Sequence, residues 1–195
     1  MKTPDNAYDH FVNSRAALWL AFAWGCAEAT LFFIVPDVLL TLLACRAWRQ
    51  AGRASLAACL GALLGGSLMF AAGTSHPAAT HGWLLRVPAI QAELVTQVET
   101  QLAAHGLMSM LLGPLKGIPY KIYAATWGAQ GGDWLSFFLY SMPARLPRLW
   151  LGVLAAHSLA WLLRHWTRRR AALEIAILSA LWLGFYCFYF NRFGW

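Results

Sequence analysis

Residues 107–130 read LMSMLLGPLKGIPYKIYAATWGAQ, and this stretch decides the fold. Four helix-breaking residues and two lysines interrupt an otherwise apolar segment: Gly113, Pro114, Lys116, Gly117, Pro119 and Lys121. A helix that faces lipid cannot hold such breaks, because the backbone groups that they free would have no hydrogen-bond partner in hydrocarbon. We therefore predict a re-entrant hairpin, in which two half-helices meet at a turn inside the protein.

An earlier apolar segment, residues 16–45, has the same character. It is too long for one membrane span and too short for two, and Pro36 interrupts it. We predict a second re-entrant hairpin with its turn at Pro36. When the chain is shifted by 83 residues, Pro36 falls on Pro119, and a long apolar segment follows the break in each half. This pattern predicts an inverted repeat, and paired broken segments indicate a transport site between the halves.

The composition of the whole chain agrees with a membrane protein. Of its 195 residues, 59% are hydrophobic and only 12% are charged, and the mean hydropathy is +0.51. An ordinary soluble domain has about 25% charged residues. Disorder, a coiled coil and a soluble enzyme core fit this composition poorly. We predict an all-α integral membrane protein with one membrane domain over residues 1–195.

Further apolar segments supply the spans of this domain. Residues 54–73 contain no charge and are long enough to cross a hydrocarbon core of about 30 Å as a helix. The segments 135–163 and 171–190 are also long and apolar, although the first contains Arg145 and Arg148 and the second has Glu174 near its start. The prediction is a re-entrant hairpin followed by a transmembrane helix in each half, divided as follows: first repeat 16–73, second repeat 88–163, additional C-terminal transmembrane helix 171–190.

Residues 88–105 predict an amphipathic helix at the membrane interface. Pro88 suits the first turn of a helix. An apolar face follows helical spacing through Leu94, Val95, Val98 and Leu102. Polar residues fill much of the remaining circumference, so we expect this helix to cover the second hairpin without spanning the membrane.

The distribution of basic residues sets the orientation. With the predicted spans, nine lysines and arginines lie on the N-terminal side of the membrane and two on the other side. Cytoplasmic loops carry the excess of basic residues in membrane proteins. We expect a multi-pass protein of the cytoplasmic (inner) membrane, with its N-terminus cytoplasmic, its C-terminus outside, and two hairpins that enter from opposite faces.

Two arginines in the stretch SMPARLPRLW are candidates for substrate binding. Arg145 and Arg148 are three residues apart and therefore share one face of a helix. The planar guanidinium binds a phosphate through two parallel hydrogen bonds. An anionic headgroup therefore suits this pair better than a neutral solute does. Snorkelling to the interface and pairing with acidic residues are the alternatives.

Two lysines and two acids complete the candidate site. Lys116 and Lys121 flank the turn of the second hairpin, where the N-termini of half-helices also favour an anion. Glu28 and Asp37 are candidates for proton coupling, because charges at membrane depth usually face a cavity or one another. The alternatives are a structural salt bridge for Glu28, a helix cap for Asp37 and interfacial snorkelling for the lysines.

Other residues point to packing and not to chemistry. Gly61, Gly65 and Gly66 are expected to be helix-packing positions. The four cysteines form no CxxC pair and the six histidines show no ligand spacing, so we expect no metal and no cofactor. No nucleophile elbow, P-loop or zincin motif is present, and we predict that the chain is not an enzyme.

Taken in order, these motifs resemble the DedA or VTT-domain membrane proteins, also called SNARE-associated Golgi protein homologues. The resemblance covers about residues 23–157. It is carried by the following elements: Glu28, Pro36-Asp37, the glycine-rich stretch 61–73, His105-Gly106, the hairpin 113–128, Ala144-Arg145 and Arg148. The chain resembles a divergent member, because Gly65-Gly66 stands where the family has a Gly-Asp pair and a lysine stands in place of the hairpin arginine.

The resemblance implies opposed re-entrant hairpins and movement of lipid phosphates across the bilayer. For bacterial members it implies recycling of undecaprenyl phosphate with a role for proton-motive force, and for eukaryotic relatives phospholipid scrambling. The leading hypothesis is thus a translocase whose partners are lipids with phosphate headgroups and protons, and not nucleic acid. Assembly into homo-oligomers stays open. The alternative is a structural or assembly membrane protein with internal salt bridges and no transport.

Overall fold

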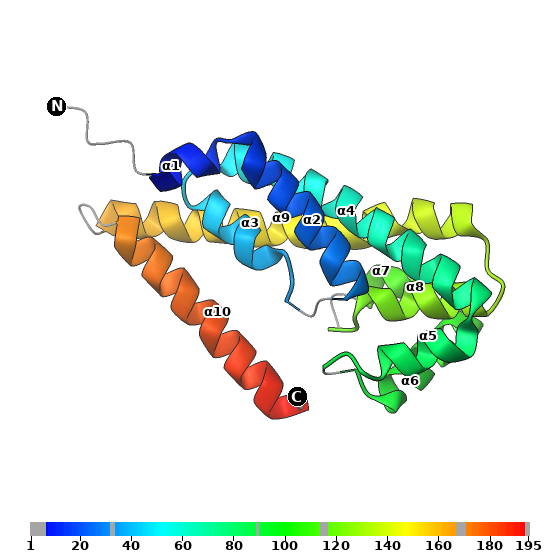
Figure 1. Cartoon of the computed structure of the whole chain (residues 1–195). Coiled ribbons are helices and arrows are strands. Elements are labelled where there is room, and N and C mark those ends of the chain that lie inside the picture. The colour runs from blue at the N-terminus through cyan, green and yellow to red at the C-terminus, as the bar shows by residue number, and fades with distance from the viewer. Residues whose placement is uncertain (1–6, 32–33, 89, 114–116, 167–170, 194–195) are drawn as a thin grey trace.

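The computed structural model describes residues 7–31, 34–88, 90–113, 117–166 and 171–193. Every regular element in these ranges is an α-helix, which confirms the predicted all-α fold. The helices follow one another in this order: α1 (Ala7–Val12), α2 (Arg15–Thr30), α3 (Asp37–Ala44), α4 (Trp48–Ser75), α5 (Pro77–Leu84), α6 (Ala92–His105), α7 (Met108–Leu112), α8 (Tyr120–Ala129), α9 (Trp134–Trp166) and α10 (Ala171–Phe193) (Figure 1).

Two helices are long and apolar enough to cross a membrane, namely α4 over Trp48–Ser75 and α9 over Trp134–Leu163. The outer face of α4 carries a row of exposed leucines four residues apart: Leu56, Leu60, Leu64 and Leu68. A water-soluble helix presents a polar outer face, so this exposed apolar row is typical of a helix that faces lipid. The apolar stretch Ile175–Asn191 of α10 is shorter, and its role as a third span stays a prediction.

Helix α4 crosses α2 at a contact made by glycines on both helices. A Cβ atom at Gly61 of α4 would lie 1.9 Å from the carbonyl oxygen of Phe22 in α2. In the opposite direction, a Cβ at Gly25 of α2 would lie 2.0 Å from the carbonyl oxygen of Ala58. The backbones therefore touch directly, as in the close helix pairs that small residues allow in membranes. Gly65 belongs to the same crossing.

A second crossing of the same kind joins the other end of α4 to α8. A Cβ at Gly73 of α4 would lie 2.1 Å from the carbonyl oxygen of Ala125. A Cβ at Gly128 of α8 would lie 2.2 Å from the carbonyl oxygen of Phe70. Helix α4 is thus the common support of both broken segments.

Both predicted breaks are present in the chain. The first lies between α2 and α3, where Pro36 immediately precedes α3 and the chain reverses direction (Figure 1). The second lies between α7 and α8, where Gly113 caps α7, Gly117 has a positive φ of 81° and Pro119 immediately precedes α8. The predicted turn residue Pro114 and the predicted ligand Lys116 lie outside the described residues.

The predicted interfacial helix is shorter than expected. Helix α6 begins at Ala92, and Pro88 lies in the turn before it, so the predicted start at residue 88 is wrong. The reason is that Val87 and Ile90 are buried, and the chain must turn to place both in the core. The apolar face is correct, because Val95, Val98 and Leu102 are buried: this is the face that packs towards α8.

Helices α1 and α5 were not expected from the sequence. Both are short, at six and eight residues, and neither has the extended apolar periodicity that identifies a helix without its context.

At the start of α9, Asp133 acts as a cap. The backbone N–H and the hydroxyl of Ser136 donate to Asp133 Oδ2 at 2.7 and 2.8 Å, and these hydrogen bonds lower the pKa of the Asp133 carboxyl.

Helix α10 diverges from α9 and runs below α3 in this view (Figure 1), and it contacts α3. Two hydrogen bonds tie it to the first broken segment. Trp182 Nε1 donates to Thr41 Oγ1 at 2.9 Å, and the backbone N–H of Val35 donates to the Tyr186 hydroxyl at 3.0 Å. Helix α10 therefore closes one side of the space that holds the candidate site.

Candidate functional site

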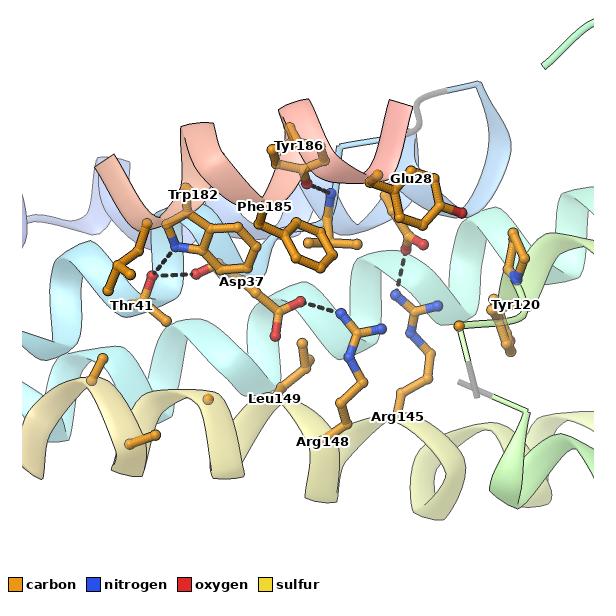
Figure 2. A pocket seen from close by; sticks show the side chains of 18 of the residues that line it. Glu28, Asp37, Thr41, Tyr120, Arg145, Arg148, Leu149, Trp182, Phe185 and Tyr186 are labelled. Atoms are coloured by element: carbon orange, nitrogen blue, oxygen red, sulfur yellow. Dashed lines mark hydrogen bonds and ion pairs between the residues drawn. The ribbon is translucent and has the colours of Figure 1, made fainter. Parts of the chain in front are cut away.

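A cavity of about 690 Å³ is lined by four parts of the chain: the first broken segment, the second broken segment, α9 and α10. Its walls are mainly apolar, and α10 contributes an aromatic side (Figure 2). The charged residues that line it are Glu28, Asp37, Lys121, Arg145 and Arg148. The fold thus brings together five of the six ionisable residues that the sequence singled out, and the sixth, Lys116, is outside the described residues.

The deeper of two ion pairs joins Arg145 to Glu28. Arg145 Nη2 donates to Glu28 Oε2, and the two side chains are only 6% and 9% exposed. Glu28 lies in the last turns of α2, on a face that the glycine crossing holds against α4. The pair therefore connects the first broken segment to α9.

The second ion pair joins Arg148 to Asp37 and is more open. Arg148 Nη2 donates to Asp37 Oδ2 at 2.5 Å, and the Arg148 side chain is 31% exposed. Asp37 is the first residue of α3, directly after Pro36. Figure 2 shows the two arginines side by side on α9, each reaching towards its own carboxylate. The structure thereby assigns each acid to an arginine, which the spacing in the sequence left open.

Lys121 adds a third cation to the wall of the cavity. It lies in the first turn of α8 and is 2% exposed. With three cations and two carboxylates in their usual ionisation states, the described lining has a net charge of +1. Such a lining attracts an anion, and a phosphate can take the place of a carboxylate on a guanidinium because both accept paired N–H donors.

Ion pairs of this kind contribute little net stability. The cost of removing two charges from water offsets most of their attraction, so a well-packed apolar pair would hold the helices at least as well. What the pairs do provide is a set of donors already aimed at the cavity.

Several residues of the site were not expected from the sequence. Tyr120 lies beneath Arg145, and Thr41, Trp182 and Tyr186 join α10 to the first broken segment. Uncharged residues in apolar stretches give no signal by themselves. One sign was present: Tyr120 is the residue that the 83-residue shift places on Asp37, and both directly follow the proline of a break.

The remaining predicted positions are helix contacts. Gly61 and Gly65 lie at the α2 crossing, and Gly66 faces the ring of Tyr120. Within the part of the chain that is described, no three histidine, cysteine or acidic side chains gather into a group that could hold a metal ion. Cys26, Cys45, Cys59 and Cys187 are not joined by disulfide bonds.

No family model, curated protein or solved structure matches this chain. The resemblance to the DedA or VTT-domain proteins therefore stays a prediction from the motifs. The residues of the cavity and their geometry are the ground on which a function can be argued.

Proposed function

We propose that the protein is a membrane lipid translocase that moves a lipid phosphate, polyprenyl phosphate or phospholipid, between the leaflets. One observation carries the proposal. Arg145 and Arg148, one turn apart on α9, reach into a largely apolar cavity, and each is held there by a carboxylate from a different side of the first break. Two guanidinium groups at this spacing offer enough N–H donors for the oxygens of one phosphate headgroup.

The proposal includes two re-entrant hairpins, α2–α3 and α7–α8, related as an inverted repeat. Its support is that backbone groups at both breaks find partners within the protein. Trp24 Nε1 donates to the carbonyl of Ile34 at 2.9 Å, next to the bond between Val35 and Tyr186. At the second break, the N–H of Ile118 donates to the carbonyl of Gly113 at 3.0 Å. Non-helical backbone at membrane depth requires such partners.

In the proposed cycle, the phosphate enters the cavity and takes over N–H donors of the two arginines. Glu28 and Asp37 then lose their partners beside an anion, a state that repulsion in a poorly hydrated cavity makes costly. Proton uptake by the carboxyl groups removes this repulsion, and release of the proton restores the ion pairs when the lipid leaves. The acyl or prenyl tail stays in the bilayer throughout.

The test is leaflet exchange of fluorescently labelled lipid phosphates in phosphatidylcholine proteoliposomes. Wild type is compared with Arg148→Ala, with the double variant Arg145→Ala/Arg148→Ala, and with Arg53→Ala, an exposed arginine of α4, as the matched control. We expect exchange in wild type and Arg53→Ala and a loss of at least tenfold in the other two. Exchange that is absent for every labelled phosphate, or unaffected by losing both arginines, would contradict the translocase.

Proton coupling has a separate test in the same vesicles. Glu28→Gln keeps the shape of the side chain and can still accept a hydrogen bond from Arg145, but it cannot exchange a proton. The titratable and charged groups that interact with Glu28 include Arg145 from α9, Tyr120 and Lys121 from α8, and Tyr186 from α10. We expect the rate in Glu28→Gln to depend on pH differently from wild type, and an unchanged profile would remove Glu28 from the coupling.

A second function has one observation in its favour, namely that both arginines already have a carboxylate partner. A structural or assembly protein would need the pairs only as ties between α9 and the first broken segment. It predicts that the exchanged pair Glu28→Arg/Arg145→Glu retains function in cells. A translocase loses function in this variant, because the arginine introduced at position 28 lies on α2 and no longer shares a helix face with Arg148 of α9.

A further inference from the structure

The guanidinium of Arg145 has a second neighbour besides Glu28. Its Cζ atom lies 4.6 Å from the centre of the Tyr120 ring, within the range of a cation–π interaction (Figure 2). Tyr120 is 2% exposed and Arg145 is 6% exposed, so water competes little with this contact. Among the described residues, Arg145 Nε has no hydrogen-bond partner. The Tyr120 ring therefore holds the guanidinium without using any of its N–H donors.

The hydroxyl of Tyr120 is fixed by a short chain of hydrogen bonds. Ser141 Oγ donates its only proton to the carbonyl of Phe137 at 2.7 Å. The 2.7 Å bond between Ser141 Oγ and the Tyr120 hydroxyl must then have tyrosine as the donor. Both partners belong to α9, with Ser141 about one turn and Phe137 about two turns before Arg145, so the ring keeps its place relative to the helix that carries the arginine.

The ring itself is fixed on its other sides. Phe137 stacks on Tyr120 with ring centres 5.7 Å apart and an interplanar angle of 25°, and Phe70 stacks on Phe137 at the same spacing. Gly66 of α4 leaves room for the phenol, because a Cβ there would lie 2.4 Å from its oxygen. Phe70, Phe137, Tyr120 and Arg145 thus form one column, with the cation at its cavity end.

We propose that Tyr120 is a positioning residue. It keeps the Arg145 guanidinium at the cavity wall while the N–H donors of that guanidinium leave Glu28 and bind a phosphate. This inference rests on the proposed function. When the ion pair with Glu28 is broken, an arginine with no other contact could change its side-chain conformation and leave the cavity wall or turn towards water. The aromatic face holds it without offering a negative charge, whereas a second carboxylate in this place would compete with the phosphate.

The contact is tested first by NMR on the full chain, labelled with ¹⁵N, in phosphatidylcholine nanodiscs. The Arg145 Nε–H resonance is assigned by its absence in Arg145→Lys, and the exposed Arg53 serves as the reference arginine. In the Glu28→Gln background we expect the Arg145 resonance to stay shifted upfield of Arg53 by the ring current of Tyr120. Addition of Tyr120→Phe should preserve the shift, because the ring remains.

A resonance at the Arg53 position in Glu28→Gln, with Tyr120 intact, overturns the proposal. This arm requires no large substitution, so it does not depend on how well a truncated variant folds. The matched control is Tyr123→Leu, which removes another buried tyrosine from the same helix. The hydroxyl of Tyr123 donates to Gln101 and does not contact the site. This variant should leave the Arg145 resonance in place, whereas Tyr120→Leu should move it to the Arg53 position.

Exchange of labelled lipid phosphate in proteoliposomes gives the second arm. A desolvated cation–π contact is worth about 2 kcal/mol, which corresponds to a change in binding of about 30-fold. Tyr120→Leu should raise the lipid concentration for half-maximal exchange by about that factor, and Tyr120→Phe by no more than about twofold. An unchanged value in Tyr120→Leu overturns the positioning role. No exchange in wild type, together with the expected resonances, would contradict the translocase while supporting the contact.

Discussion

The two breaks of the chain share one construction and differ in what they present to α9. In each, a proline precedes the second short helix, and the next residue meets an arginine of α9. After Pro36 that residue is Asp37, which binds Arg148; after Pro119 it is Tyr120, whose ring lies against Arg145. The same position supplies an anion in one half and an uncharged aromatic face in the other.

The difference indicates which contacts can be exchanged. The first break contributes both carboxylates of the cavity, Glu28 and Asp37, and in our proposal an incoming phosphate competes with them for the arginines. The second contributes Tyr120 and Lys121, which do not compete with an anion. The first half therefore holds both arginines through its carboxylates, and in our proposal Tyr120 of the second half holds Arg145 when a phosphate is bound.

The strongest way to break this comparison is to remove the buried acid of the first half. Glu28→Ala leaves the Arg145 charge buried without its carboxylate, which should cost about 3–5 kcal/mol of folding free energy. Asp37→Ala should cost clearly less, about 1–2 kcal/mol, because Arg148 is 31% exposed and water can solvate it. Denaturant titration of the purified protein in detergent measures both.

Glu99→Ala is the control for these variants, since Glu99 is exposed on α6 and its loss should change stability by less than about 0.5 kcal/mol. Equal losses for Glu28→Ala and Asp37→Ala would show that burial does not distinguish the two pairs. The claim that Tyr120 shares in holding Arg145 also bears on this result. If the aromatic contact is strong, Glu28→Ala should fall at the lower end of its range.

Much of the scaffold could be predicted from the sequence, because its signals are local. Proline and glycine mark both breaks, long apolar segments mark α4 and α9, and the spacing of Val95, Val98 and Leu102 marks the buried face of α6. The six charged candidates were identifiable for the same reason, since a charge in an apolar stretch is conspicuous. The start of α6 was misplaced because burial of Val87 and Ile90 is decided by tertiary contacts.

The pairing within the site could not be predicted. Arg145 and Glu28 are 117 residues apart, and no local pattern says which acid reaches which arginine. Tyr120, Ser141 and Gly66 come from three different helices, and their fit depends on the depth to which each helix packs. Such contacts follow from the assembled core, where side-chain volume and direction matter more than residue type.

A smaller effect is expected from the glycine crossings, and it sharpens the comparison because both halves rely on α4. Gly128→Ala places a Cβ 2.2 Å from the carbonyl oxygen of Phe70, so α8 must move away from α4. We expect a loss of about 1–3 kcal/mol by the same denaturant titration. Gly82→Ala in α5 is the control, because nothing lies within 4 Å of its added Cβ.

Gly25→Ala makes the equivalent change at the α2 crossing, where the Cβ would lie 2.0 Å from the carbonyl oxygen of Ala58. If the two halves are supported alike, its cost should match that of Gly128→Ala. A cost for both that is no larger than that of Gly82→Ala would mean that the helices separate easily and that α4 is not the common support.

The smallest expected effect concerns two tyrosine hydroxyls, one for each half. Tyr186 of α10 accepts the N–H of Val35 at the first break, and Tyr123 of α8 donates to Gln101 Oε1 of α6 at 2.6 Å. Tyr186→Phe leaves a partly buried backbone N–H without this acceptor, at a cost of about 1–2 kcal/mol. Tyr123→Phe should cost about 0.5–1 kcal/mol, because the partly exposed Gln101 amide can turn to water. A larger loss in Tyr123→Phe would reverse the comparison. The hydrogen bond between α8 and α6 would then contribute more stability than the one between α10 and the first break.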